Sequence, residues 1–224
     1  MFYDPIYFIY IIPGLILSII AQIWITTSFK KYSHLSTGSN ITGQQAAQII
    51  KEGEQFPVSI KVQGDNLSDH FDPTKDMVSI STASLEDSVA SVAVVAHEFG
   101  HVQQKYTNSL LFNLRTGLVP IVNIGSRLGY ILIIAGLILN ILGLAEIGLM
   151  LFALTTVFAL VTLPIEIDAS KRAFKLIRKY NLISESRIGG AKSVLSGAAT
   201  TYIAALLTSL LNLLYYASLI RRRG

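Results

Sequence analysis

The chain has 224 residues, of which 51% are hydrophobic and only 14% are charged. An ordinary soluble domain carries about 25% charged residues, so this composition excludes a disordered chain and disfavours a purely soluble enzyme. There is no cysteine, which excludes disulfides, iron–sulfur clusters and cysteine-ligated zinc. The formal net charge is +4, and the basic residues are unevenly placed along the chain.

Four runs without a charged residue account for this composition, and each has about the 20 residues that a helix needs to cross a bilayer. The first is long and has no basic segment before it, so residues 1–29 are predicted to be a retained transmembrane anchor rather than a cleaved signal peptide. The second and third predict a transmembrane hairpin within residues 116–165, and the fourth predicts a hydrophobic helix within residues 193–224. The runs themselves are 5–29, 128–145, 147–165 and 193–220.

The placement of basic residues predicts an orientation. Lys30 and Lys31 directly follow the first run, and residues 166–192 hold seven basic against three acidic side chains. Because cytoplasmic loops are enriched in Lys and Arg, we expect residues 30–115 and the basic segment 166–192 on the cytoplasmic side of the cell membrane. A spanning fourth run would place Arg221–Arg223 outside, against this rule. That run is therefore either spanning or re-entrant.

Residues 30–115 are the long polar stretch of the chain, and they predict a small domain on the membrane surface. Thr42 and Gln45 have the spacing of a capping box, and Gly53 is a helix stop signal. The whole chain is therefore predicted to be an α+β, multi-pass helical membrane protein with a helix-strand-strand-helix domain. The predicted elements of this domain are a helix over 42–53, a strand over 58–63, a strand over 77–81 and a helix from Ser84 through Val102.

The last predicted helix carries His97-Glu98-Phe99-Gly100-His101, which has the pattern His-Glu-x-x-His. Positions i and i+4 lie on one face of a helix, so both imidazoles can reach one tetrahedral zinc at about 2.0–2.1 Å. Glu98 lies beside the first histidine and can take a proton from a water that zinc activates. An ordinary amphipathic helix with incidental histidines does not explain why half of the four histidines fall in five residues.

A catalytic zinc needs a third protein ligand and an open fourth position. Glu146 is excluded, because the predicted topology places it at the outer end of the hairpin. His34 and His70 lie upstream of the motif, and Glu166 and Asp168 follow the third hydrophobic run. The residues alone leave these four candidates open. Glu166 also has a structural explanation, since an acid after Pro164 suits the first turn of a helix.

Three segments together resemble the YugP-like zinc-dependent membrane metallopeptidases of bacteria. These proteins typically contain Asp-His-Tyr-Asp-Pro, His-Glu-x-x-His and Pro-x-Glu-x-Asp-Ala-Ser, and the resemblance covers most of the chain. Phe71 replaces the tyrosine of the first segment. A more distant resemblance connects the chain to prenyl-protein proteases, from which it departs by having Ser170 where they have an acid. The matching segments here are DHFDP at 69–73, HEFGH at 97–101 and PIEIDAS at 164–170.

The resemblance implies a gluzincin-type site in which His97, His101 and Glu166 bind Zn²⁺ and Glu98 is the general base. Glu166 and Asp168 are two positions apart, so on a helix they point about 200° apart and cannot both face the metal. We expect Pro164 to begin a helix with Glu166 in its first turn. Asp168 should turn away toward Lys171 or Arg172, or support a ligand histidine.

Two further residues have both a functional and a structural interpretation. His70 could contact substrate or the oxyanion, or it could be an ordinary turn residue beside Asp69 and Asp72. Tyr202 could donate its hydroxyl to the tetrahedral intermediate, but an interfacial or core tyrosine is the commoner case. The basic stretch 171–179 is typical of a surface facing anionic lipid, and nucleic-acid binding is not expected.

These observations predict a membrane-bound zinc metalloendopeptidase that hydrolyses peptide bonds of membrane or membrane-proximal proteins. The strand over 77–81 is a candidate edge to which an extended substrate could add. The alternative is a non-catalytic metal-binding scaffold or sensor, which the intact Glu98 disfavours. A transporter is disfavoured because the hydrophobic runs contain no acidic residue that could form an ion path.

Overall fold

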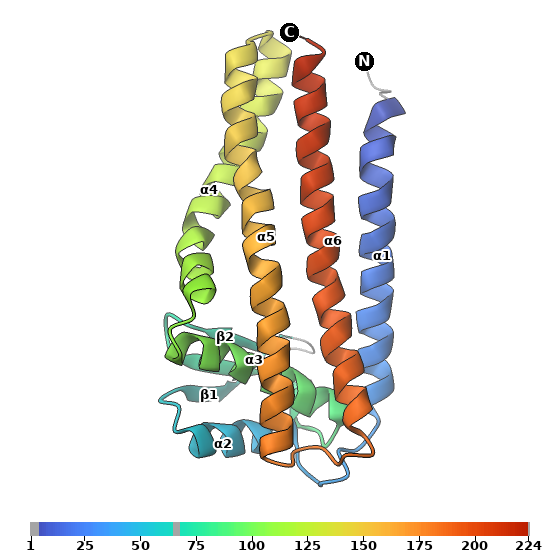
Figure 1. The fold of residues 1–224 in the computed structure, drawn as a ribbon, viewed down its shortest axis with the longest axis vertical. Coiled ribbons are helices and arrows are strands. Elements are labelled where there is room, and N and C mark those ends of the chain that lie inside the picture. Colours follow the sequence, from blue (N-terminus) through green and yellow to red (C-terminus); the bar gives the residue numbers. More distant parts are fainter. Residues whose placement is uncertain (1–4, 65–67, 224) are drawn as a thin grey trace. The chain divides into compact units, whose positions relative to one another are not determined.

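The computed structural model describes residues 5–64 and 68–223, and these are mostly helical with one small sheet. The described part of the chain contains four helices long and apolar enough to cross a membrane (Figure 1). The chain forms two compact units, and each of these four helices contributes residues to both. The four helices are α1 (Pro5–Ser33), α4 (Leu110–Leu139), α5 (Leu142–Lys179) and α6 (Ile188–Arg221).

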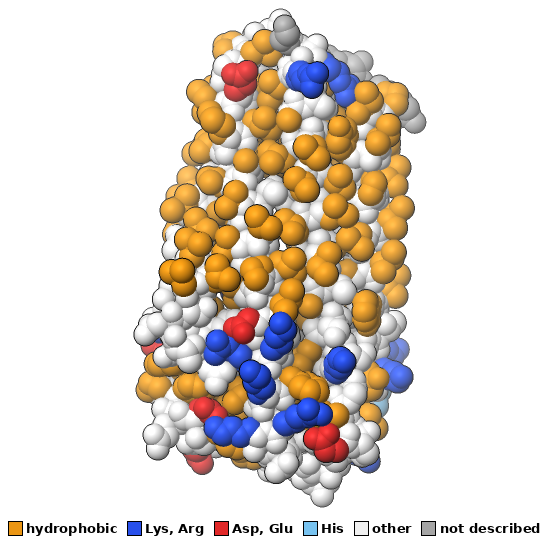
Figure 2. All heavy atoms as spheres, in the orientation of Figure 1, with side chains coloured by type: hydrophobic (Ala, Val, Ile, Leu, Met, Phe, Trp, Pro, Cys, Tyr) orange, Lys and Arg blue, Asp and Glu red, His pale blue; other side chains and the backbone are white. Residues whose placement is uncertain are grey.

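Unit 1 comprises Met1–Ala21, Asn113–Pro164 and Thr201–Gly224. Within it, α4 and α5 approach closely because glycines face each other: a Cβ added at Gly129 would lie 2.7 Å from the carbonyl oxygen of Gly148. Small residues allow such close contact between helices in a membrane. Large apolar side chains cover the visible surface of these helices (Figure 2), as a lipid environment requires.

Unit 2 comprises Gln22–Phe112 and Ile165–Thr200 and contains the sheet. The strand order is β1-β3-β2, with β1 parallel and β2 antiparallel to β3, and α2 packs against α3. The coarse prediction of a helical protein with four membrane-length helices and a small sheet is confirmed. The elements of this unit are α2 (Gly43–Glu54), β1 (Ser59–Val62), β2 (His70–Asp72), β3 (Met77–Ile80), a 3₁₀ helix, η1 (Thr82–Leu85), and α3 (Val89–Tyr106).

The capping box of α2 is confirmed. The Gln45 backbone N–H donates to the Thr42 hydroxyl at 3.2 Å, and the Thr42 N–H donates to the Gln45 side-chain oxygen at 2.9 Å. The predicted stop at Gly53 is wrong, because the helix continues to Glu54 and ends where Gln55 adopts a left-handed conformation (φ 56°). Gly53 instead lies against the ring of Tyr180, which leaves no room for a Cβ.

The predicted start of α3 at Ser84 is also wrong. The helix begins at Val89, and the Ser88 hydroxyl accepts the Ser91 N–H at 3.1 Å. Asp87 lies three residues after Ser84, which is the spacing of a capping acid, but it instead accepts hydrogen bonds from Ser36 and Thr37. A tertiary contact therefore overrides the local capping signal.

Two further expectations require correction. The strand over 77–81 is not an edge, because β3 lies between β1 and β2. The edge strand β2 was assigned to a turn-rich loop. Pro164 does not begin a helix: α5 runs without interruption from Leu142 to Lys179. Glu166 consequently lies in the interior of a long helix rather than in a first turn.

Candidate metal centre

Helix α3 presents two histidines on one face, one turn apart. The rings of His97 and His101 have centroids 4.9 Å apart and are almost perpendicular. His101 is buried, and His97 is partly exposed. Their Nε2 atoms point to a common position, as the i, i+4 spacing on a helix requires.

Helix α5 brings Glu166 to that position, although it lies 69 residues from His97 in the chain. Its Oε2 atom is 3.2 Å from His97 Nε2 and 3.4 Å from His101 Nε2. Neighbouring ligand atoms of a tetrahedral zinc with bonds of about 2.0–2.1 Å lie about 3.3 Å apart. The two distances from Glu166 therefore match the spacing of zinc ligands, and the three candidate ligand atoms all lie within 4.8 Å of one another. Glu166 is only 1% exposed, and a buried carboxylate requires such partners.

Glu98 lies beside this group and is held by the sheet. Its Oε2 atom accepts the backbone N–H of Phe71 on β2 at 2.9 Å. Burial raises the pKa of Glu98, while His97 and His101 act in the opposite direction. A raised pKa brings a carboxylate closer to the range in which it can both accept and return a proton near neutral pH.

The close approach of α3 and α5 depends on Gly100, the fourth residue of the motif. A Cβ at this position would overlap the carbonyl oxygen of Ala169 on α5. Because that neighbour is backbone, it cannot rotate aside as a side chain could. The absence of a side chain at Gly100 therefore sets the distance across which Glu166 reaches the histidines.

Gln104 is a buried residue that the sequence reasoning missed. Its side-chain NH₂ donates to the carbonyl of Ile165 and to Asp168, both at 2.8 Å. Two acceptors around the NH₂ group direct Oε1 toward His101 Nδ1, 2.9 Å away. His101 must therefore donate from Nδ1, so that Nε2 is the nitrogen directed to the candidate metal position. A polar residue three positions after His101, on the buried face of the helix, was the available signal.

Asp168 turns away from the three ligand atoms, in the direction expected for it. It accepts a hydrogen bond from Arg172 Nε at 2.6 Å as well as the one from Gln104. The Ser170 hydroxyl lies 3.2 Å from His97 Nδ1 and so contacts the other histidine from its outer side. Both His97 and His101 thus have a hydrogen-bonding partner on the ring nitrogen that faces away from Glu166.

The remaining candidates are not part of this grouping. Among the described residues, the cluster with metal-ligand spacing consists of His97, His101 and Glu166. His70 lies on β2, is exposed and has its Nδ1 2.8 Å from the Ser68 carbonyl. His34 is exposed just after α1. Tyr202 belongs to unit 1, and no role in the centre follows for it.

The donor set fits zinc. Two neutral imidazoles and one anionic carboxylate are a ligand combination that occurs in catalytic zinc sites. Three protein ligands leave the fourth position of a tetrahedral zinc open. The hydrogen bonds that His101 makes with Gln104 and His97 makes with Ser170 are of the kind that orient metal-binding histidines.

Comparisons with known proteins connect the chain to zinc peptidases. A family model described as "Putative neutral zinc metallopeptidase" matches residues 7–221. The chain is 35% identical over 207 residues to "Putative membrane protease YugP" of Bacillus subtilis, covering 92% of each chain. No solved structure matches. From residue 7 to residue 221, the chain belongs to the family described as "Putative neutral zinc metallopeptidase".

Proposed function

We propose that the protein is a membrane-bound zinc metalloendopeptidase of the gluzincin type. The observation that carries the proposal is the meeting of three ligand atoms, His97 Nε2, His101 Nε2 and Glu166 Oε2, from two helices. Family membership supports the same conclusion. The proposal assigns metal binding to these three residues and acid–base chemistry to Glu98.

Zinc in a three-ligand site supplies an activated water and polarises a carbonyl group. Glu98 accepts the proton of the attacking water and then delivers it to the departing amine. The hydrogen bond from the Phe71 N–H fixes one carboxylate oxygen of Glu98, which leaves the other oxygen to exchange the proton. Burial of this carboxylate raises its pKa, which favours the return of the proton at the end of the reaction.

The edge strand β2 is the proposed substrate platform. It is three residues long, pairs with β3 on one side and contacts Glu98 through its central residue. An extended peptide that adds to such an edge satisfies its own backbone groups and passes beside the base. His70, exposed on the same strand, is the side chain we propose to contact substrate.

Membrane proteins and peptides near the membrane surface are the proposed substrates. Glu166 directly follows the charge-free run 147–165 on the same helix, so the proposed ligand lies at the end of a membrane-length apolar segment. We assign this end to the cytoplasmic side, because Lys30, Lys31 and the basic residues of 166–192 cluster there.

Glu98→Gln tests the mechanism. The amide cannot take a proton, so cleavage of a panel of membrane-protein substrates should fall about 10²–10⁴-fold. Zinc measured by inductively coupled plasma mass spectrometry should stay near the wild-type amount, since Glu98 is not a ligand. Glu86→Gln makes the same chemical change at an exposed position and should cleave normally.

Full cleavage by the Glu98→Gln variant would disprove the role of the base. Zinc binding without cleavage in the wild-type protein would instead indicate a non-catalytic scaffold or sensor. Both measurements are needed, because activity alone does not separate a lost base from a lost metal.

A further inference from the structure

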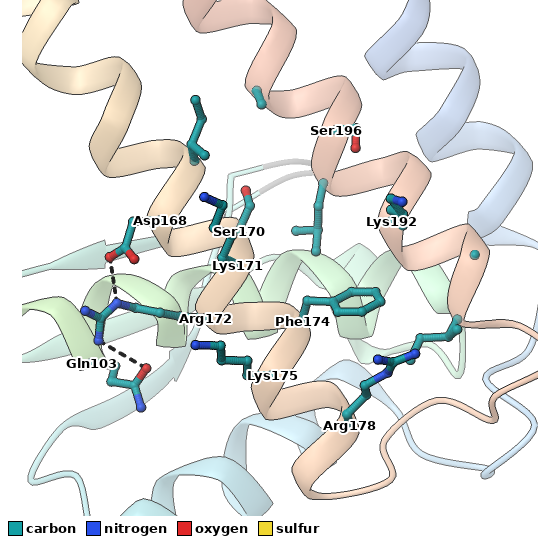
Figure 3. Close-up of a pocket in the computed structure, with 15 residues that line it drawn as sticks. Gln103, Asp168, Ser170, Lys171, Arg172, Phe174, Lys175, Arg178, Lys192 and Ser196 are labelled. Atoms are coloured by element: carbon teal, nitrogen blue, oxygen red, sulfur yellow. Dashed lines mark hydrogen bonds and ion pairs between the residues drawn. The ribbon is translucent and has the colours of Figure 1, made fainter.

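A cavity lies within unit 2, between α5 and α6, and has a volume of about 1110 Å³ (Figure 3). Four cationic side chains that line it have no part in the proposed chemistry. Phe174 extends from α5 toward α6 in the middle of the cavity, and Arg178 and Lys192 approach it from the two helices. We call this cavity the cationic pocket. Five cationic residues line it: Arg172, which is paired with Asp168, and the four others, Lys171, Lys175, Arg178 and Lys192.

The cationic pocket and the metal centre use different faces of α5. Ile167, Lys171, Phe174 and Arg178 follow the i, i+4, i+7, i+11 spacing of one helical face and line the pocket. Ile165, Glu166, Ala169 and Ala173 are buried on the other side of the helix. The three proposed metal ligands do not line the pocket, although Asp168 and Ser170 do, and Ser170 contacts His97 from there.

The cations that line the pocket outnumber the acids that line it: five cationic residues stand against Asp168. Arg172 at its border is paired with Asp168 at 2.6 Å, and Arg178 is 3.5 Å from Glu185 in an exposed pair. No ion pair is formed by Lys171, Lys175 or Lys192 with any acid in the described part of the chain. Like charges held close together repel one another, so this arrangement favours an anion.

The pocket walls are apolar, which distinguishes it from a simple phosphate site. Phe174 and the buried Leu195 line it together with the buried Ile188. Its cations lie where the apolar runs end: Lys192 directly precedes the run 193–220, and Lys171 follows the run 147–165 by six residues. Figure 2 shows Lys and Arg side chains gathered over this part of α5 and α6.

We propose that the cationic pocket binds the headgroup of an anionic phospholipid. The lysines contact the phosphate, and the apolar wall around Phe174 and Leu195 packs against the first part of an acyl chain. Free phosphate would leave that wall without a partner. An acidic peptide would need partners for its backbone groups, but of the other polar residues that line the cavity Gln103, Asp168 and Ser170 already form hydrogen bonds within the protein.

The test counts lipids bound to the full-length protein by native mass spectrometry from detergent. Dioleoyl phosphatidylglycerol should bind the wild-type protein at least about tenfold more tightly than dioleoyl phosphatidylcholine. Each lysine near an anionic headgroup contributes about fivefold in affinity, so Lys175→Gln with Lys192→Gln should lose roughly 25-fold for phosphatidylglycerol.

A matched control variant carries Lys51→Gln and Lys61→Gln, two lysines of the same unit outside the pocket. It has the same net charge as the pocket variant and should bind phosphatidylglycerol as the wild type does. Both variants should keep their zinc, which shows that they are folded and that the metal centre is unchanged.

Equal loss in the pocket and control variants would overturn the proposal, because net charge alone would then explain binding. Displacement of the lipid by equimolar inorganic phosphate would reduce the pocket to a phosphate site, and displacement by an equimolar glutamate-rich peptide would make it a protein-binding site. Either result overturns the lipid assignment. None of these measurements depends on peptidase activity.

Discussion

The choice between two carboxylates is decided at the scale of single residues. Glu166 and Asp168 share one helix, but Glu166 contacts both histidines whereas Asp168 contacts Gln104 and Arg172. The two acids therefore have separable roles: one faces the candidate metal, and the other supports the amide that orients His101.

Replacing each acid by alanine should separate these roles. Glu166→Ala should lose bound zinc and activity, because only two protein ligands remain. Asp168→Ala should keep most of its zinc, since the Gln104 amide remains bonded to the Ile165 carbonyl, and should weaken metal affinity by about 10–100-fold. Zinc analysis after gel filtration checks both. Zinc lost from the Asp168 variant and kept in the Glu166 variant would show that the ligand was misassigned.

At the scale of elements, the packing of α3 on α5 should be the feature most sensitive to substitution. Gly100→Ala inserts a methyl group against the Ala169 backbone, and overpacking of this kind costs about 1–3 kcal/mol. The helices must separate, so zinc affinity and melting temperature should both fall. Gly117→Ala on α4 meets no atom within 4 Å and is the control. Unchanged zinc affinity in the Gly100 variant would contradict this account.

Asp87 joins the start of α3 to the loop after α1, and its contribution should depend on pH. Burial raises its pKa, but hydrogen bonds from Thr37 and Ser36 outweigh burial and hold the pKa below its usual range. A carboxylate with a lowered folded-state pKa stabilises the fold above its unfolded pKa of about 3.9, and this stabilisation is lost as pH falls through the folded value.

Asp87→Asn should therefore lower the melting temperature at pH 7, because the amide NH₂ cannot accept the hydrogen bonds that the carboxylate accepts. The difference from the wild type should shrink below about pH 4. Circular dichroism melts across this range provide the measurement. A difference that stays constant with pH would exclude the ionised carboxylate as the cause.

Helix and strand boundaries were predicted best where they depend on residues close together in the sequence. The capping box of Thr42 and Gln45 depends on residues three apart, and it formed as expected. The start of α3 was misplaced because Asp87 bonds to residues about 50 positions away. Strand β2 has three residues and exists through its pairing with β3, so no periodic pattern could reveal it. Pro164 was assigned to a helix start, yet a membrane-length helix accommodates it in its interior.

In the candidate site, too, the residues that depend on local spacing could be predicted, and those that depend on another helix could not. The pair His97 and His101 could be found from spacing alone, because one helix fixes their relation. The partner from α5 required a resemblance, since nothing in the local sequence relates Glu166 to a residue 69 positions earlier. The position of Gln104, three residues after His101, was a signal for a partner of that histidine, but its bonds to the Ile165 carbonyl and Asp168 of another helix could not be read from it.

At the scale of the whole molecule, orientation in the membrane is the main prediction. The chain has no cysteine, so single cysteines can report it without background. Lys61→Cys, on exposed β1, should resist a membrane-impermeant thiol reagent in intact cells and react after lysis. Gly143→Cys, where a new side chain meets nothing within 4 Å, should react in intact cells. The reverse labelling pattern would place the sheet outside the cell.

The ligand set also has a mechanical consequence. An ion bound by both His101 and Glu166 would link α3 to α5. It would close the segment between them into a loop, as a disulfide does in a secreted domain. A crosslink that closes a loop of some 65 residues stabilises the folded state by about 4 kcal/mol, because it reduces the conformational entropy of the unfolded chain. The stabilisation is smaller if the helices stay in the membrane while the rest of the chain unfolds. In a chain without cysteine, the ion proposed for catalysis would thus also be a crosslink, and a chelator that removed it would lower the stability of the fold.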